Sequence, residues 1–303
     1  MKTCTKIIGN NTNGIIALSG DNQLTSLDDY KITTSWRDST KMVVSDGAPG
    51  MIGVPGGMCG NSANGVVVFA GNAINYLSCL GNTRATWKTL TGAPFTAKSA
   101  GGIGGIVGDP VNGLTAFGYD ANGVQQVMQL QPGDDVPAWK AKVLPPFVVK
   151  MIAGDTTGGV LIVGDKGSAS QYSRSGPDCS CEWKTPVAIP FKVEILCGDA
   201  VGGFVFYGEG QMMSVDPKGA IARPPSLNFS ITAMTGNQAG GVAAILVGGA
   251  IAYCTDLMKA QWIVIGGPAA DQVATVAALT TAPAHAVTPS NAAPVQAPEP
   301  ATA

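Results

Sequence analysis

Residues 195–208 read Ile-Leu-Cys-Gly-Asp-Ala-Val-Gly-Gly-Phe-Val-Phe-Tyr-Gly: an apolar run, a polar turn, and a second apolar run that ends in glycine. The turn motif, Gly-[Asn/Asp]-x-x-[Asn/Gly]-Gly, occurs six times in the 303 residues. Its second position is occupied by Asn10, Asn61, Asp109, Asp155, Asp199 and Asn237. Successive copies are 51, 48, 46, 44 and 38 residues apart, and a period of this length predicts one supersecondary unit per copy.

The chemistry of each copy predicts a small meander of strands. Asn/Asp-Gly turns between apolar runs are typical of β-hairpins. The second run, such as residues 160–164, is apolar at nearly every position, so both of its faces should be buried. One meander cannot cover both of its faces, but six packed around an axis can. The sequence therefore predicts an all-β protein, a six-bladed β-propeller of four-stranded antiparallel blades over residues 1–267.

Tryptophan closes five of the six copies at a fixed place in the repeat. These residues are Trp36, Trp87, Trp139, Trp183 and Trp262. A fixed repeat position favours packing between blades over the stacking of sugars on exposed rings. In the fifth copy Arg223-Pro224-Pro225 replaces the tryptophan, which predicts that this blade is the least regular.

The third and fourth strands of some copies carry a family resemblance. The segment 76–81 leading to Trp87, and the segment 171–176 leading to Trp183, resemble a degenerate Asp-box, the Ser-x-Asp-x-Gly-x-x-Trp hairpin of sialidase-like (BNR-like) propellers. Residues 214–219 keep the Ser, Asp and Gly without the Trp. Glycine-rich propellers of this low-charge type recur among photosystem-assembly factors and bacteriophage virion proteins. The resemblance implies a propeller in the style of the virion proteins.

Composition excludes several classes of protein. Charged residues make up 13% of the chain, and its 18 Lys and Arg are outnumbered by 20 Asp and Glu, which argues against nucleic-acid binding. The apolar runs are far shorter than a membrane span, so no membrane insertion is expected. Residues 1–6 have no apolar stretch behind them, so we expect synthesis in the cytoplasm without a signal peptide. Seven cysteines cannot all pair within one chain.

The composition changes at residue 268. The segment 268–303 holds 13 Ala and 6 Pro and no aromatic residue. It predicts an Ala/Pro-rich extension, with a short helix at 269–279 followed by an extended linker. Two interpretations remain open, a terminus without a role and a tether that docks on a partner or on a neighbouring copy.

The six Asn and Asp residues of the turn motif are the candidate binding residues. In a propeller they would form a rim on one face, where Asp109, Asp155 and Asp199 would come from consecutive blades. Such a rim could hold Ca²⁺ or a ligand through its oxygen atoms. The alternative is that Asn and Asp cap their own turns, and recurrence in all six copies favours that alternative.

The sequence offers little for catalysis. The single histidine, His285, lies in the extension, so no nucleophile–base pair is supported. Glu194 and Glu209 are the only propeller glutamates worth naming as a glycosidase pair. No phosphate-binding loop or metal-binding motif is present, so no catalytic residue, metal or cofactor is expected.

Three functions remain as hypotheses. The first is a non-enzymatic structural or interaction propeller, a bacteriophage virion component of the tail or an adsorption appendage, whose partners are virion proteins or copies of itself. The second is a carbohydrate-binding or sialidase-like glycan-processing propeller that contacts a surface glycan through the rim. The third is an assembly factor that grips a protein partner.

Overall fold

The computed structural model describes the parts of the chain that form the repeat. The described residues are 3–10, 12–20, 23–27, 37–43, 56–70, 73–77, 87–90, 95, 102–131, 138–155, 159–164, 168–172 and 187–266. They form six four-stranded sheets, and within each sheet the strands pair in chain order. In the described part of the chain, neighbouring strands pair antiparallel, as in β1–β2, β2–β3 and β3–β4 of the first sheet.

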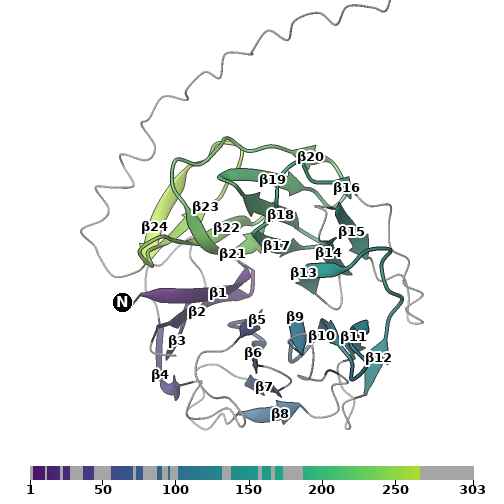
Figure 1. Ribbon diagram of the computed structural model, residues 1–303. Helices are drawn as coiled ribbons and strands as arrows, with labels where there is room; N and C mark the ends of the chain where they lie inside the picture. Colours follow the sequence, from purple (N-terminus) through teal and green to yellow (C-terminus); the bar gives the residue numbers. More distant parts are fainter. Residues whose placement is uncertain are drawn as a thin grey trace, which may run out of the picture.

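Each sheet contributes one strand to each of four concentric positions (Figure 1). The innermost strands are β1 (Cys4–Asn10), β5 (Gly57–Asn61), β9 (Ile103–Asp109), β13 (Val149–Asp155), β17 (Ile195–Asp199) and β21 (Ile231–Asn237). The second strands are β2 (Gly14–Ser19), β6 (Gly65–Ala70), β10 (Gly113–Tyr119), β14 (Gly159–Gly164), β18 (Gly203–Gly208) and β22 (Gly241–Leu246). The third strands are β3 (Gln23–Leu27), β7 (Ala73–Leu77), β11 (Gln125–Leu130), β15 (Ser168–Tyr172), β19 (Gln211–Val215) and β23 (Ile251–Cys254). The outermost strands are β4 (Arg37–Val43), β8 (Lys88–Leu90), β12 (Trp139–Ala141), β16 (Val187–Ala188), β20 (Ile221–Ala222) and β24 (Trp262–Gly266).

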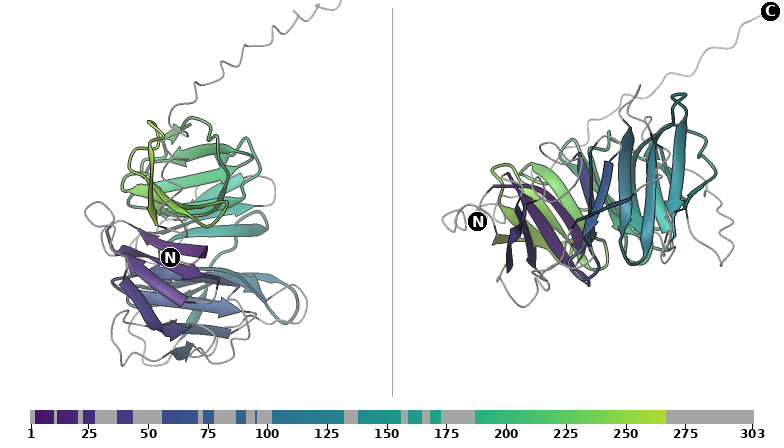
Figure 2. Two further views of the ribbon diagram at one scale, coloured as in Figure 1. Left: turned by 90° about the vertical axis from the view of Figure 1, so that its left-hand side faces the viewer. Right: turned by 90° about the horizontal axis from the view of Figure 1, so that it is seen from below.

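The sheets are blades of a closed ring. Each innermost strand contacts the innermost strand of the next blade, and β21 of the last blade contacts β1 of the first. Figure 2 shows the same ring from two further sides. The predicted all-β propeller of four-stranded antiparallel blades is confirmed. Residues 267–303 lie outside the described part, so the predicted domain boundary and the Ala/Pro-rich extension stay predictions.

The second strand of each blade forms the centre of the core. Every residue of β2, β14, β18 and β22 is buried. Hydrophobic clusters then join neighbouring blades, as between the fifth and sixth blades, where Val205 and Tyr207 lie in one cluster with Val242 and Ala244. Burial on both faces of the second strands is what their continuous apolar runs predict.

The connections between blades explain the glycines that end the second strands. The Phe95 ring lies over Gly118, where an added Cβ would come within 2.6 Å of the ring, and Phe147 lies over Gly164 in the same way at 2.5 Å. At Gly208 a Cβ would overlap the carbonyl oxygen of Lys192. The connection from the preceding blade thus passes directly over the end of each of these strands, which leaves no room for a side chain.

Noncovalent contacts close the ring, because the described part of each blade comes from one continuous piece of chain. Ile7 and Ile15 of the first blade share a cluster with Ile245 and Ile251 of the last. The Thr235 hydroxyl of β21 also donates a hydrogen bond to the carbonyl oxygen of Gly9 at 2.5 Å. This bond joins residues 226 positions apart in the sequence.

Removing this hydroxyl should weaken the closure. In Thr235→Val the half-buried carbonyl of Gly9 loses its donor, so we expect the free energy of unfolding to fall by about 1–2 kcal/mol in urea denaturation. Thr232→Val is the matched control, because the exposed Thr232 donates only to Ile245 within its own blade, at 3.2 Å. Equal losses for the two variants would contradict a role for Thr235 in closing the ring.

Candidate functional site

A cavity of about 320 Å³ lies on the axis of the ring, between the innermost strands. Its lining comes from all six innermost strands and includes Asn10, Asn61, Asp109, Asp155 and Asp199. Each of these residues ends its strand, so the turn motif places them around one mouth of the cavity. The structure thus brings these five predicted residues to one mouth, whereas Asn237, which ends β21, is not among the residues that line the cavity.

Most rim side chains cap their own turns. The side-chain oxygen Oδ1 of Asn10 accepts hydrogen bonds from the backbone N–H groups of Thr12 and Asn13 at 2.9 and 2.8 Å. In the same way, Oδ1 of Asn61, Asp109 and Asp199 accepts hydrogen bonds from the backbone N–H groups two and three residues later in the chain. Asn237 caps the N–H of Gly240. This is the Asx-turn arrangement that satisfies backbone donors in a tight loop.

The rim also links neighbouring blades. Asp109 Oδ2 accepts from the side-chain amides of Asn61 and Asn64 in the preceding blade, at 3.4 and 3.1 Å, and from Asn112 at 2.9 Å. Asp199 Oδ2 accepts from Asn237 of the following blade at 2.6 Å. Both oxygens of each of these carboxylates are therefore used in hydrogen bonds.

Backbone bonds repeat the same linkage. The N–H of Ala63 donates to the carbonyl of Asn13, and the N–H of Ala239 donates to the carbonyl of Gly202. The two bonds are equivalent, because each joins a turn to that of the preceding blade. Together with the side-chain bonds, they make the rim a brace between blades.

The rim does not assemble a metal site in the described part of the chain. No group of three or more His, Cys, Asp or Glu side chains there lies close enough to hold a metal ion. Since Asp109 and Asp199 accept hydrogen bonds at both oxygens, they offer little to a Ca²⁺ ion, which needs six to eight oxygen ligands.

Two buried thiols, Cys59 and Cys197, also line the cavity. They occupy equivalent places two residues before Asn61 and Asp199. Burial raises the pKa of both thiols well above the ordinary value, and the carboxylates of Asp109 and Asp199 raise them further. Burial likewise raises the pKa of Cys4 and Cys254 to about 11. All four are held as neutral, inert thiols at physiological pH.

Cys59 and Cys197 should resist alkylation. In native protein at pH 8 we expect iodoacetamide to label them at least about 100-fold more slowly than in urea, measured peptide by peptide with mass spectrometry. Because the folded state keeps these thiols protonated, their titration should leave the free energy of unfolding unchanged below pH 8.5. Above that pH it should fall, by up to about 1.4 kcal/mol per pH unit for each thiol. Fast native labelling of either residue would contradict this assignment.

The tryptophans lie in the packing between blades. Trp87 packs against the cluster shared by the first and second blades, and Trp139 against that of the second and third. Trp262 is buried in the cluster of the fifth and sixth blades, where its ring meets Phe229 edge-on at 5.6 Å. Trp36 and Trp183 lie outside the described residues.

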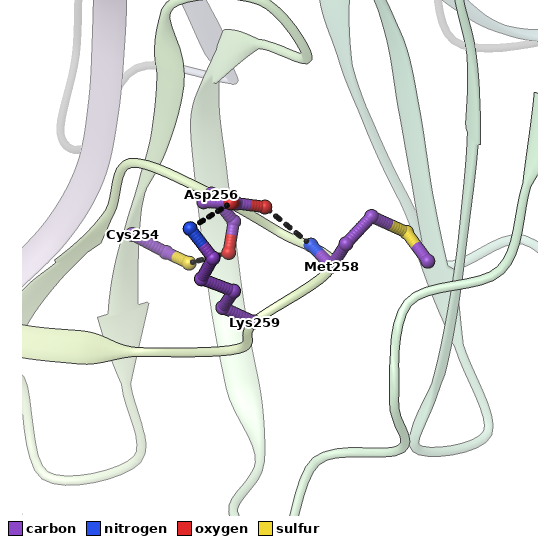
Figure 3. Close-up of polar contacts among 4 residues, drawn as sticks. All are labelled: Cys254, Asp256, Met258 and Lys259. Carbon is purple, nitrogen blue, oxygen red and sulfur yellow. Dashed lines mark hydrogen bonds and ion pairs between the residues drawn. The ribbon is translucent and has the colours of Figure 1, made fainter.

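In the fifth and sixth blades, the loop between the third and fourth strands is also capped by aspartate. Figure 3 shows Asp256, which accepts from the N–H of Met258 at 3.0 Å and pairs with Lys259 at 3.1 Å, while the Cys254 thiol donates to the Asp256 carbonyl at 3.3 Å. The hydrogen bond from Lys259 lowers the pKa of Asp256. Asp216, the aspartate of the Asp-box-like segment, caps Lys218 and Ala220 in the equivalent loop. The Asp-box resemblance stays a prediction.

The antiparallel order of the strands gives the disc two different flat faces. The face that carries the turn motif and the loops between third and fourth strands is called the turn face. The opposite face carries the hairpins between second and third strands and the connections between blades, and is called the connection face. Every described loop belongs to one of these faces, because each strand crosses the disc.

A second cavity, about 590 Å³, opens on the connection face. Met151 and Phe191 are among its apolar lining residues, and Lys150, Lys192 and Glu209 supply its charges. Glu209 lies in the two-residue turn between β18 and β19 with a φ of 53°, in the left-handed region. Only Glu209 of the predicted glutamate pair lines this cavity, since Glu194 is exposed outside its lining.

Most of the large exposed apolar side chains in the described part of the chain lie on the two flat faces. Of the ten in the described part, three are on the turn face: Val111, Val201 and Met258. Five are on the connection face: Val124, Val143, Leu144, Val148 and Val247. Ile221 and Ile263 lie on outermost strands. None of these surface residues was singled out from the sequence, because a valine in a turn motif gives no signal that distinguishes it from other loop residues.

No protein-family model and no curated protein matches this chain. Among solved structures it is similar to the Myceliophteria thermophila Cps50 (Swd1) β-propeller domain, with a TM-score of 0.51, 6% identity and 81% of each chain covered. It is also similar to a putative gluconolactonase, with a TM-score of 0.51, 12% identity, and 80% of this chain and 85% of the other covered. At these identities the likeness shows the β-propeller fold alone.

Proposed function

We propose that this chain is a non-enzymatic interaction propeller that acts through its two flat faces. The observation that carries the proposal is the placement of exposed apolar side chains: eight of the ten in the described part lie on those faces. Exposed apolar groups that cluster on a surface mark sites of protein contact. The rim around the axis supports the same view, because its carboxylates hold turns and neighbouring blades together.

Within this class we propose a bacteriophage virion component of the tail or an adsorption appendage. The support is the resemblance of the glycine-rich, low-charge repeats to virion propellers, together with the Ala/Pro-rich extension as a tether. Partners would be other virion proteins or further copies of this chain.

Purified particles test this assignment. Gradient-purified phage particles from the source of the gene should contain the protein at a fixed stoichiometry by quantitative mass spectrometry, and the amount should survive a second purification. Absence of the protein from the particles would contradict the proposed virion role. Binding or turnover on a glycan array that is lost in Asp155→Ala, with folding intact, would instead favour a glycan-directed propeller.

A further inference from the structure

The two flat faces carry opposite charge in the described part of the chain. Among the described residues, the turn face holds five carboxylates, Asp109, Asp155, Asp199, Asp216 and Asp256, against the three lysines Lys88, Lys218 and Lys259. The connection face holds five cations, Lys6, Lys142, Lys150, Lys192 and Arg223, against the three carboxylates Asp120, Glu194 and Glu209. Within the described part, the turn face is therefore net negative and the connection face net positive, although the whole chain has a net charge of only −2.

The apolar side chains follow the same division. Val201 is the most exposed large apolar residue of the described chain, at 76%, and it projects from the turn capped by Asp199. On the other face Val143, at 66%, follows the outermost strand β12 and stands beside Leu144 and near Lys142 in sequence. Each face thus combines apolar groups with one dominant sign of charge.

We propose that the turn face of one copy docks on the connection face of a second copy, in a head-to-tail stack. The occupant is this chain itself, because each face supplies the charge and apolar groups that the other face needs. Pairing of two identical faces is disfavoured, since it would bring like charges together. When two copies bind through different faces, one turn face and one connection face stay free at the two ends, so further copies can add to the stack. This inference rests on the proposed interaction function and names its partner.

Two single variants block one face each. Val201→Lys places a cation on the acidic turn face, and Val143→Glu places a carboxylate on the basic connection face. Both side chains are largely exposed, so the fold should tolerate the changes. Ile263→Lys is the matched control, because Ile263 is 62% exposed and lies within the outermost strand β24, outside the loops that form the two faces.

Sedimentation velocity of the full chain over a concentration series gives the test. The wild type and Ile263→Lys should form oligomers larger than dimers at 50 mM salt, and these should weaken by at least about tenfold in apparent affinity at 500 mM. Val201→Lys and Val143→Glu should each stay monomeric. When mixed, they should form a 1:1 dimer and nothing larger, because one intact turn face meets one intact connection face.

Other outcomes overturn the stack. A wild type that stays monomeric at 200 μM and low salt contradicts it, as does continued assembly of either face variant. Failure of the mixture to dimerise contradicts the pairing of different faces, and loss of assembly in Ile263→Lys contradicts the location. These results leave the broader proposal separately testable, since incorporation into particles through another protein does not require a second copy.

Discussion

Gly208→Ala should lower the free energy of unfolding by at least about 3 kcal/mol, measured by urea denaturation followed through tryptophan fluorescence. The added methyl group would overlap the carbonyl oxygen of Lys192, where the connection from the fourth blade crosses the end of β18. A backbone atom cannot rotate away as a side chain can, so either the connection or the strand must move. Both are packed against the core, because Gly208 and Phe191 are buried.

The repeat itself provides the matched control. Gly20 directly follows β2 of the first blade, one residue beyond the place that Gly208 holds in its own blade, and an added Cβ there would find only the Thr3 carbonyl oxygen at 3.8 Å, an ordinary contact. Gly20→Ala should therefore change stability by less than about 1 kcal/mol, and restriction of the unfolded chain should even favour it. Similar losses in free energy of unfolding for the two variants would show that glycine is needed at the strand end for its flexibility, and not because the connection between blades crosses Gly208.

Asp109→Ala should be the most damaging change in the rim, with a loss of about 3 kcal/mol in the free energy of unfolding. The substitution removes the cap of two backbone N–H groups at 2.9 Å each. It also leaves the amide groups of Asn61, Asn64 and Asn112 without their shared acceptor, in a place where Asp109 is only 5% exposed.

Asn10→Ala measures the contribution of the turn cap without that of the hydrogen bonds between blades. Asn10 caps Thr12 and Asn13 in the same way, so its replacement should cost about 1 kcal/mol. The difference of about 2 kcal/mol between the two variants is the expected contribution of the bonds that reach Asp109 from the side-chain amides around it. Equal losses would mean that the rim acts within each turn alone.

The sequence predicts the repeat well because the unit is local. Each turn motif contains both the Asn or Asp that caps the turn and the glycines that close the hairpin. The turns at residues 9–14 and 198–203 can therefore be predicted from their own residues, without knowledge of the other blades. The apolar second strands are equally clear, since burial on both faces removes the alternation of ordinary strands.

The polar contacts between blades could not be predicted from the sequence, in contrast to the packing of the tryptophans. Asn64 and Asn112 fill the fifth position of the motif, where three other copies have glycine, and only the folded ring shows that their amides donate to Asp109. Thr235 stands where Cys59 and Cys197 stand in other blades, and its bond to Gly9 depends on closure of the whole chain. The charge difference between the faces also needs the strand order, because acids and bases alternate along the sequence without a visible pattern.

Incorporation into particles tests most directly whether the propeller binds its partners through its flat faces. The measurement is the amount of Val201→Lys relative to wild type in purified phage particles assembled in cells that supply only the variant. We expect Val201→Lys to keep the urea midpoint of the wild type, and its incorporation into particles to fall at least about tenfold. Incorporation of this stable variant at the wild-type level would contradict the account.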